Sequence, residues 1–145
     1  MNETTLIAHL SKAVMDELSA SIAYKVLAEK VIDAPELSDE LKAHATDEME
    51  HFNKIIELAA ARGLCEQIPM VLDPEVFADM PSEKFAVIYK VQQLEKTAIN
   101  DYAGIVVEAR AVSDLEVERL FMELLREEQE HFDDLAQYTG QVRKS

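Results

Sequence analysis

The chain has 145 residues, which is the size of one domain with its own core, so we expect a single domain over residues 1–145. Apolar residues make up 48% of it, against 3 Gly and 4 Pro, and this balance favours an all-α fold. The formal charge of −15 at pH 7 would repel nucleic acid and anionic lipid. We therefore expect no nucleic-acid and no membrane partner, and a cation as the more natural ligand.

The first predicted helix covers residues 4–33. Residues of one face recur at spacings of three and four, as in an amphipathic helix, in the series Ile7, Leu10, Val14, Ser21, Tyr24, Ala28 and Val31, with position 17 between Val14 and Ser21. Glu17 is the acidic residue that interrupts this apolar stripe. Pro35 then breaks the pattern and leaves room only for a tight connection to an antiparallel neighbour.

The second predicted helix covers residues 36–62 and carries two polar residues, Glu48 and His51, on its apolar face. Gly63 after it is a typical stop signal. The segment from Gly63 to Pro81 contains three of the four prolines and shows no helical period in its apolar residues, so it is predicted to be a long connection.

The third predicted helix covers residues 82–112, with Glu95 in its apolar stripe. Ser113 followed by Glu116 is a capping-box pattern, which predicts that the next helix begins after a second tight turn. This arrangement mirrors the first hairpin, because a single Glu again lies on the inner face of the first helix of the pair.

The fourth predicted helix covers residues 114–139, ends at Gly140 and carries Glu128 and His131 on its inner face. Two short connections and one long one join the four helices. The pattern therefore predicts an antiparallel four-helix bundle with a long crossover between the second and third helices.

The two halves of the chain resemble each other. DEMEHF at residues 47–52 recurs as EEQEHF at 127–132, and ELSASIAY at 17–24 aligns with EKTAINDY at 95–102. The sequence therefore consists of two related helical hairpins.

This repeat places six metal-binding side chains inside the predicted bundle. A Glu and a His three residues apart lie about 60° apart on one helix face, so each pair can hold one ion. Burying four carboxylates without a nearby Lys or Arg costs several kcal/mol per unpaired charge, so the interior needs positive charge. Two divalent ions would supply it, and iron or manganese suits these donors. The six residues are Glu17, Glu48, His51, Glu95, Glu128 and His131.

These residues resemble the ferritin-like carboxylate di-iron family, and bacterioferritin most closely. The resemblance covers nearly the whole chain and implies two iron ions per chain. It implies that Glu48 and Glu128 bridge the irons, and that one Glu and one His complete each shell, in the pairs Glu17 with His51 and Glu95 with His131. Cage-forming members carry a fifth helix, whereas only QVRKS follows Gly140, so we expect a homo-oligomer that is a twofold dimer or an altered shell.

The resemblance also suggests roles for three further residues. Tyr24 and Tyr102, each seven residues after a predicted ligand, would hydrogen-bond a ligand carboxylate in the catalytic site, or would simply be core tyrosines. Met49 stands where bacterioferritins place a methionine that binds haem b across a twofold interface. It points about 100° away from Glu48, out of the bundle, where ordinary interface packing is the alternative.

The leading functional hypothesis is a ferroxidase that oxidises Fe(II) with oxygen or hydrogen peroxide, for iron storage or detoxification. The alternative is a non-storage di-iron oxidase, peroxidase or oxygenase, because one ligand set supports several chemistries. An alternative of another class is a metal-free acidic bundle that binds a basic partner. The single cysteine, Cys65, and an N-terminus without a secretory signal favour the cytoplasm.

Overall fold

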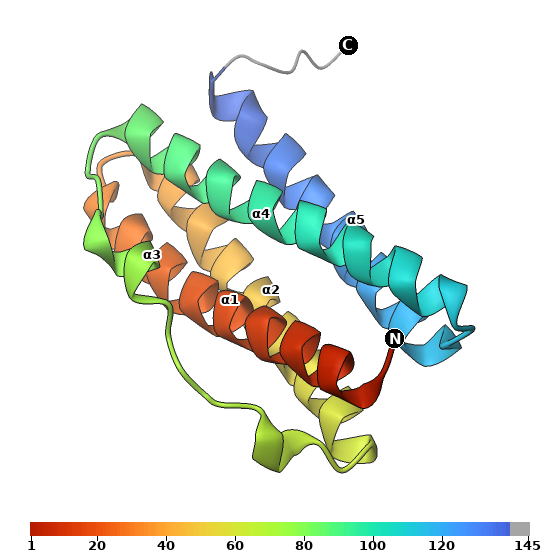
Figure 1. Cartoon of the computed structure of the whole chain (residues 1–145). Helices are drawn as coiled ribbons and strands as arrows, with labels where there is room; N and C mark the ends of the chain where they lie inside the picture. The colour runs from red at the N-terminus through yellow and green to blue at the C-terminus, as the bar shows by residue number, and fades with distance from the viewer. Residues whose placement is uncertain (140–145) are drawn as a thin grey trace.

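Four long antiparallel helices form a bundle in the computed structural model, which describes residues 1–139 (Figure 1). They are α1 (Glu3–Lys30), α2 (Pro35–Ala61), α4 (Lys84–Ala111) and α5 (Leu115–Ala136). All regular elements within the described range are helical. The predicted fold class, an all-α four-helix bundle with a crossover in the middle of the chain, is confirmed.

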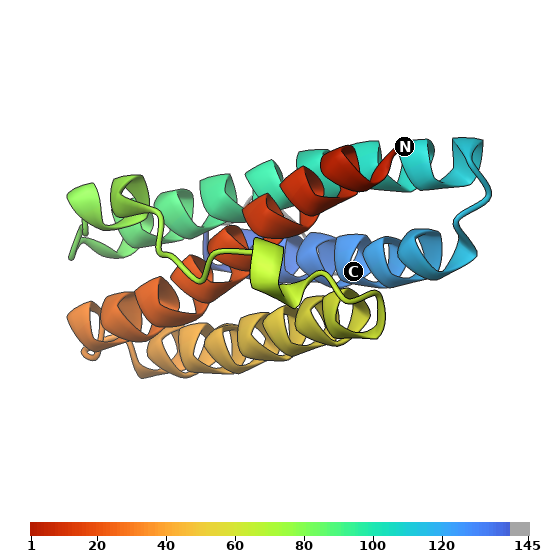
Figure 2. The same cartoon turned by 60° about the horizontal axis from the view of Figure 1, so that its bottom comes forward.

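Each half of the chain forms one hairpin, in which α1 packs along α2 and α4 packs along α5. The crossover between the hairpins passes across α1 on its way from the end of α2 to the start of α4 (Figure 2). It contains a 3₁₀ turn, η1 (Cys65–Gln67), and a short helix, α3 (Pro74–Ala78).

The sequence pattern did not predict α3, which is too short to show a helical period. The local residues explain it, because Asp73 accepts a hydrogen bond from the backbone N–H of Glu75 and Pro74 occupies the first turn. Val76 anchors the helix, with its side chain only 8% exposed. This anchor holds the crossover against the bundle.

The helix ends differ slightly from the sequence-based boundaries. α1 ends at Lys30, and α5 gives way at Ala136 to a 3₁₀ turn, η2 (Gln137–Thr139). The predicted stop at Gly140 lies outside the described residues. The N-cap of α5 is Asp114, whose side chain accepts from the backbone of Val117, and not Ser113 as the capping-box pattern predicted.

Ser113 instead belongs to the end of α4, where it has a φ of 58°. The same turn ends α2, where Gly63 has a φ of 68°. In both hairpins the next backbone N–H returns to a helix carbonyl over 2.9 Å, from Leu64 to Ala59 and from Asp114 to Ala109. This is the Schellman arrangement, and it makes the two helix ends equivalent.

Two apolar clusters fill the bundle on either side of a central polar layer. One cluster includes Leu10, Ile55 and Phe121. The other includes Leu27 and Val87. The predicted metal ligands belong to neither cluster and lie between them along the helices. Within the described range, every helix is too short or too polar to span a bilayer.

The two equivalent turns allow a matched stability test. A left-handed backbone costs a non-glycine residue about 1–2 kcal/mol, partly offset by the greater chain entropy that glycine loses on folding. We expect Ser113→Gly to raise the free energy of unfolding by about 0.5–1 kcal/mol, and Gly63→Ser to lower it by a similar amount. Urea denaturation at one fixed metal content measures both. Equal effects of the same sign would contradict the backbone argument.

Candidate metal centre

All six residues that the repeat identified converge in the middle of the bundle. Glu17 comes from α1, Glu48 and His51 from α2, and Glu95 from α4. The last two, Glu128 and His131, come from α5. Each of the six residues is at most 5% exposed. The structure therefore places a carboxylate from every long helix in one buried layer.

Four of these residues, Glu17, Glu48, His51 and Glu128, make up what we term the first donor group. Each offers a ligand atom within 4.8 Å of the others. His51 Nδ1 lies 3.0 Å from a carboxylate oxygen of Glu17 and 3.0 Å from one of Glu128. It lies 3.8 Å from Glu48 Oε1. The imidazole thus sits at the centre of three carboxylates from three helices.

His44, Glu95 and His131 form a second donor group, whose ligand atoms also lie within 4.8 Å of one another. His44 is not part of the repeated sequence motif. It lies on α2, one turn before Glu48 and two turns before His51. That spacing is the signal that could have identified it.

Glu48 and Glu128 connect the two groups. Glu48 Oε1 lies 3.1 Å from His131 Nδ1 and 3.8 Å from His51 Nδ1. Glu128 Oε1 shows the reverse, at 3.8 Å from His131 Nδ1 and 3.0 Å from His51 Nδ1. These two carboxylates therefore lie between the imidazoles, where a bridging ligand would have to be.

Several buried donor atoms in this layer lack a hydrogen-bond partner. They include both oxygens of Glu95 and of Glu128 and one oxygen of Glu48. The buried polar side chains among the described residues include no lysine or arginine. Because an unpaired buried carboxylate costs several kcal/mol, this set fits divalent cations with a preference for oxygen and imidazole donors.

Protons balance part of this charge in the metal-free chain. Burial lowers the pKa of His51, but the neighbouring Glu128 and Glu17 carboxylates outweigh that effect and raise it to about 10. Burial, together with the charge of Glu128, raises the pKa of Glu48 well above its ordinary value. Burial does the same for the pKa of Glu95. A protonated His51 thus lies among the carboxyl groups of Glu17, Glu48 and Glu128.

The outer nitrogen of each predicted histidine ligand faces an acidic residue of the opposite hairpin. His131 Nε2 lies 3.0 Å from Asp47 Oδ2, and His51 Nε2 lies 3.6 Å from Glu127 Oε2. Asp47 and Glu127 each directly precede the motif glutamate of their helix. An N–H directed outward leaves the Nδ1 lone pair for a metal, and outer carboxylates commonly fix histidine ligands in this way.

The two predicted tyrosines behave differently. The Tyr102 hydroxyl donates a 2.7 Å hydrogen bond to Glu17 Oε1. Tyr24 is equally buried, at 1% exposure, but no hydrogen bond of its hydroxyl is found among the described residues. Burial and neighbouring carboxylates raise the pKa of both phenols, so both stay protonated.

A cavity of about 490 Å³ extends from the surface to the first donor group. It lies beside α1, α3 and α4, and its inner wall includes Glu17, Glu48, Glu128, Ala20 and Ala98. Its lining also includes two lysines and the four acids Asp16, Asp73, Glu75 and Asp79, among mostly apolar side chains. The cavity connects the solvent with one side of the buried layer.

Met49, the predicted haem ligand, is half-buried on α2. Haem binding across a twofold axis stays a prediction, because it depends on a second copy of the chain.

The comparisons with known proteins agree with this geometry at the level of the family. The family model for the ferritin-like domain matches residues 7–145. Comparison with curated proteins gave no significant match.

The tyrosine pair provides a direct test of the hydrogen bond to Glu17. Tyr102→Phe removes the hydroxyl that donates to Glu17, so we expect the affinity for Mn(II) to fall by about 10-fold. Losing a hydrogen-bond partner of a metal ligand typically costs about 10–100-fold in affinity. Tyr24→Phe is the matched control and should change affinity less than about 2-fold, because no bond is lost. Calorimetric titration of the two variants measures this. A similar loss in both would argue that ring packing, rather than the hydrogen bond, matters.

Proposed function

This chain belongs to the ferritin-like domain family, and from that premise we propose that it is a cytoplasmic di-iron ferroxidase. The observation that carries the proposal is the buried layer of four carboxylates with no buried lysine or arginine among the described residues. Two divalent ions would supply the missing positive charge. A metal-free interaction bundle would leave these buried atoms without partners, so the donor set favours metal.

We assign Glu48 and Glu128 as the ligands shared by the two ions. Their positions between His51 and His131 support this assignment. One ion would also bind Glu17 and His51, which lie 3.0 Å apart. The other would bind Glu95 and His131, whose nearest ligand atoms are 3.7 Å apart.

In this proposal Fe(II) is the substrate and oxygen or hydrogen peroxide is the oxidant. Two Fe(II) ions give up two electrons, which with two protons reduce oxygen to hydrogen peroxide, or hydrogen peroxide to two waters. The protein contributes placement and charge. Tyr102 holds Glu17 in position through its hydrogen bond, and the four acids of the cavity, which outnumber its two lysines, would attract the incoming cation.

The cavity also favours a second candidate, a non-storage di-iron oxidase, peroxidase or oxygenase with an organic substrate. A volume of about 490 Å³ is within the range of small-molecule sites. The alanines at its inner end, Ala20 and Ala98, leave space next to Glu17. An organic molecule could therefore reach the carboxylates through the same opening that would admit Fe(II).

We propose, as an extension of the family assignment, that the chain forms a homo-oligomer. In the twofold dimer, Met49 of each copy would bind a shared haem b. The absorption spectrum of the protein would then show a Soret band, and the Met49→Leu variant would lack it.

Loss of one ligand should separate a metal site from a merely buried carboxylate. We expect Glu17→Gln to slow initial aerobic Fe(II) oxidation by about 100-fold, because loss of even an outer partner typically costs about 10–100-fold. The exposed neighbour Glu50→Gln on α2 is the control and should oxidise Fe(II) at the original rate. Unchanged oxidation in a folded Glu17→Gln protein would refute the ferroxidase.

An iron titration distinguishes storage from other di-iron chemistry. Fe(II) is added in air to metal-free protein, well beyond two ions per chain, and iron that elutes with protein from a sizing column is measured. A storage protein keeps excess iron soluble in a large assembly. If binding stops near two ions per chain and the rest precipitates, the storage role is wrong and the cavity directs the search to an organic substrate.

A further inference from the structure

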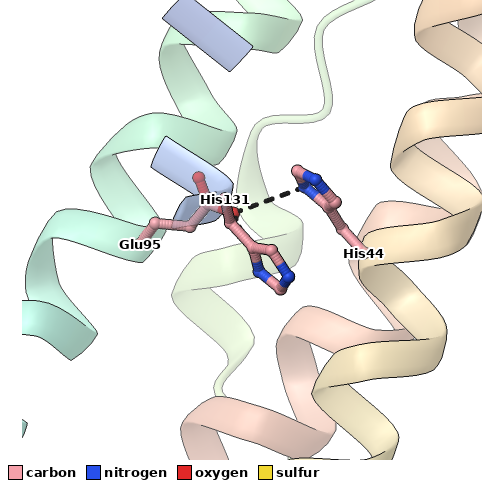
Figure 3. A group of neighbouring side chains, drawn as sticks. All are labelled: His44, Glu95 and His131. Atoms are coloured by element: carbon pink, nitrogen blue, oxygen red, sulfur yellow. Dashed lines mark ion pairs between the residues drawn. The ribbon is translucent and has the colours of Figure 1, made fainter. Parts of the chain in front are cut away.

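His44 is a buried imidazole whose hydrogen-bonding capacity is not used. Its side chain is 4% exposed, and neither ring nitrogen has a hydrogen-bond partner. Its ring stacks on that of His131, with centroids 4.0 Å apart and planes 15° apart. Nδ1 lies 3.6 Å from Glu95 Oε2, an oxygen that also lacks a hydrogen bond. Figure 3 shows the three side chains of the second donor group converging from α2, α4 and α5.

We propose that His44 is a seventh protein ligand of the metal pair, and that it makes the two metal positions chemically different. The ion at Glu95 would bind two imidazoles, from His44 and His131, whereas the ion at Glu17 would bind one, from His51. This proposal rests on the di-metal site proposed above and adds a residue that the internal repeat does not supply.

The repeat itself points to a specific role. The residue that occupies the position of His44 in the second hairpin is Leu124, one turn before Glu128 as His44 is one turn before Glu48. Leu124 is fully buried in an apolar cluster. The fold therefore accepts a hydrophobic side chain at this position, and the first hairpin has a costly buried imidazole there instead.

The orientation of His44 matches that of the two predicted histidine ligands. Its Nδ1 faces inward to Glu95, and its Nε2 lies 3.3 Å from Glu40 Oε1. His51 and His131 have the same arrangement, with Nδ1 among the central carboxylates and Nε2 facing an outer one. Donors of one ion lie at most about 4.4 Å apart, twice a metal–ligand distance, so small rotations would close the second donor group.

The cavity reaches the unshared ligands of only one of the two positions. Its lining includes Glu17 and the shared Glu48 and Glu128, but none of the three residues of the second donor group. With His44 added, the ion at Glu95 would have three ligands of its own besides the shared Glu48 and Glu128. We infer a closed, imidazole-rich position that retains its metal, and an open position at Glu17 where exchange and reaction take place.

The test compares His44→Leu, which copies the residue of the second hairpin, with the control His9→Leu on the surface of α1. Oxygen-free Co(II) titration of the full chain gives the number of ions and their affinities. We expect two ions of unequal affinity in the original protein, and a loss of at least about 10-fold at the tighter position in His44→Leu only. X-ray absorption should count about 1.5 imidazoles per ion before the change and about one after it.

Stability separates a ligand from a packing residue. If His44 is a ligand, metal-free His44→Leu is at least as stable as the original protein, but gains less stability when Co(II) is added. If the ring only packs on His131, the metal-free variant is less stable and Co(II) binding is unchanged, which overturns the proposal. His44→Gln, a polar variant, replaces His44→Leu if the latter does not fold.

The remaining outcomes are equally decisive. A third Co(II) ion that disappears in His44→Leu would place His44 in a separate site with Glu40 and Asp134, which also approach it. That result would overturn the shared position. If the original protein binds no Co(II) pair, the di-metal function itself fails. If it binds a pair that His44→Leu leaves unchanged, only the role of His44 fails.

Discussion

The burial of four carboxylates in one layer, without a buried lysine or arginine among the described residues, is the constraint on which this structure depends. Such a layer opposes folding unless protons or cations balance it. In the metal-free chain a protonated His51, whose pKa rises to about 10, supplies part of the balance. Burial raises the pKa of Glu95, and both of its oxygens still lack a hydrogen-bond partner. Metal binding at this layer would therefore be linked to folding.

The position of the layer strengthens this link. Most tertiary contacts lie within the hairpins, between α1 and α2 and between α4 and α5. The two donor groups instead combine side chains from both hairpins, and Glu48 and Glu128 face each other from opposite halves. A metal pair would therefore connect the two hairpins across the interface that has the fewest helix contacts. The same ions would perform the chemistry and join the two halves.

The repeat made the fold and the six central residues predictable, because each hairpin encodes the same pattern of apolar stripe and inward polar group. The features that the sequence did not predict are those that break the repeat or the helical period. His44 aligns with Leu124 in the second hairpin, so His44 is not part of the repeated motif. α3 is held by one cap and one buried valine rather than by a stripe. Ser113 ends α4 through its backbone conformation, which residue type does not reveal.

The departure from symmetry bears directly on what the site can do. A protein that passes both irons to a mineral needs both positions to exchange, but the cavity reaches Glu17 and the two shared carboxylates and does not reach Glu95. If His44 also binds the ion at Glu95, that ion has few free positions and a longer route to solvent. One iron would then act as a fixed partner that shares electrons, while the other meets the oxidant or an organic molecule. The asymmetry between the hairpins thus favours one retained ion and one exchanging ion over a pair of ions that both leave as product.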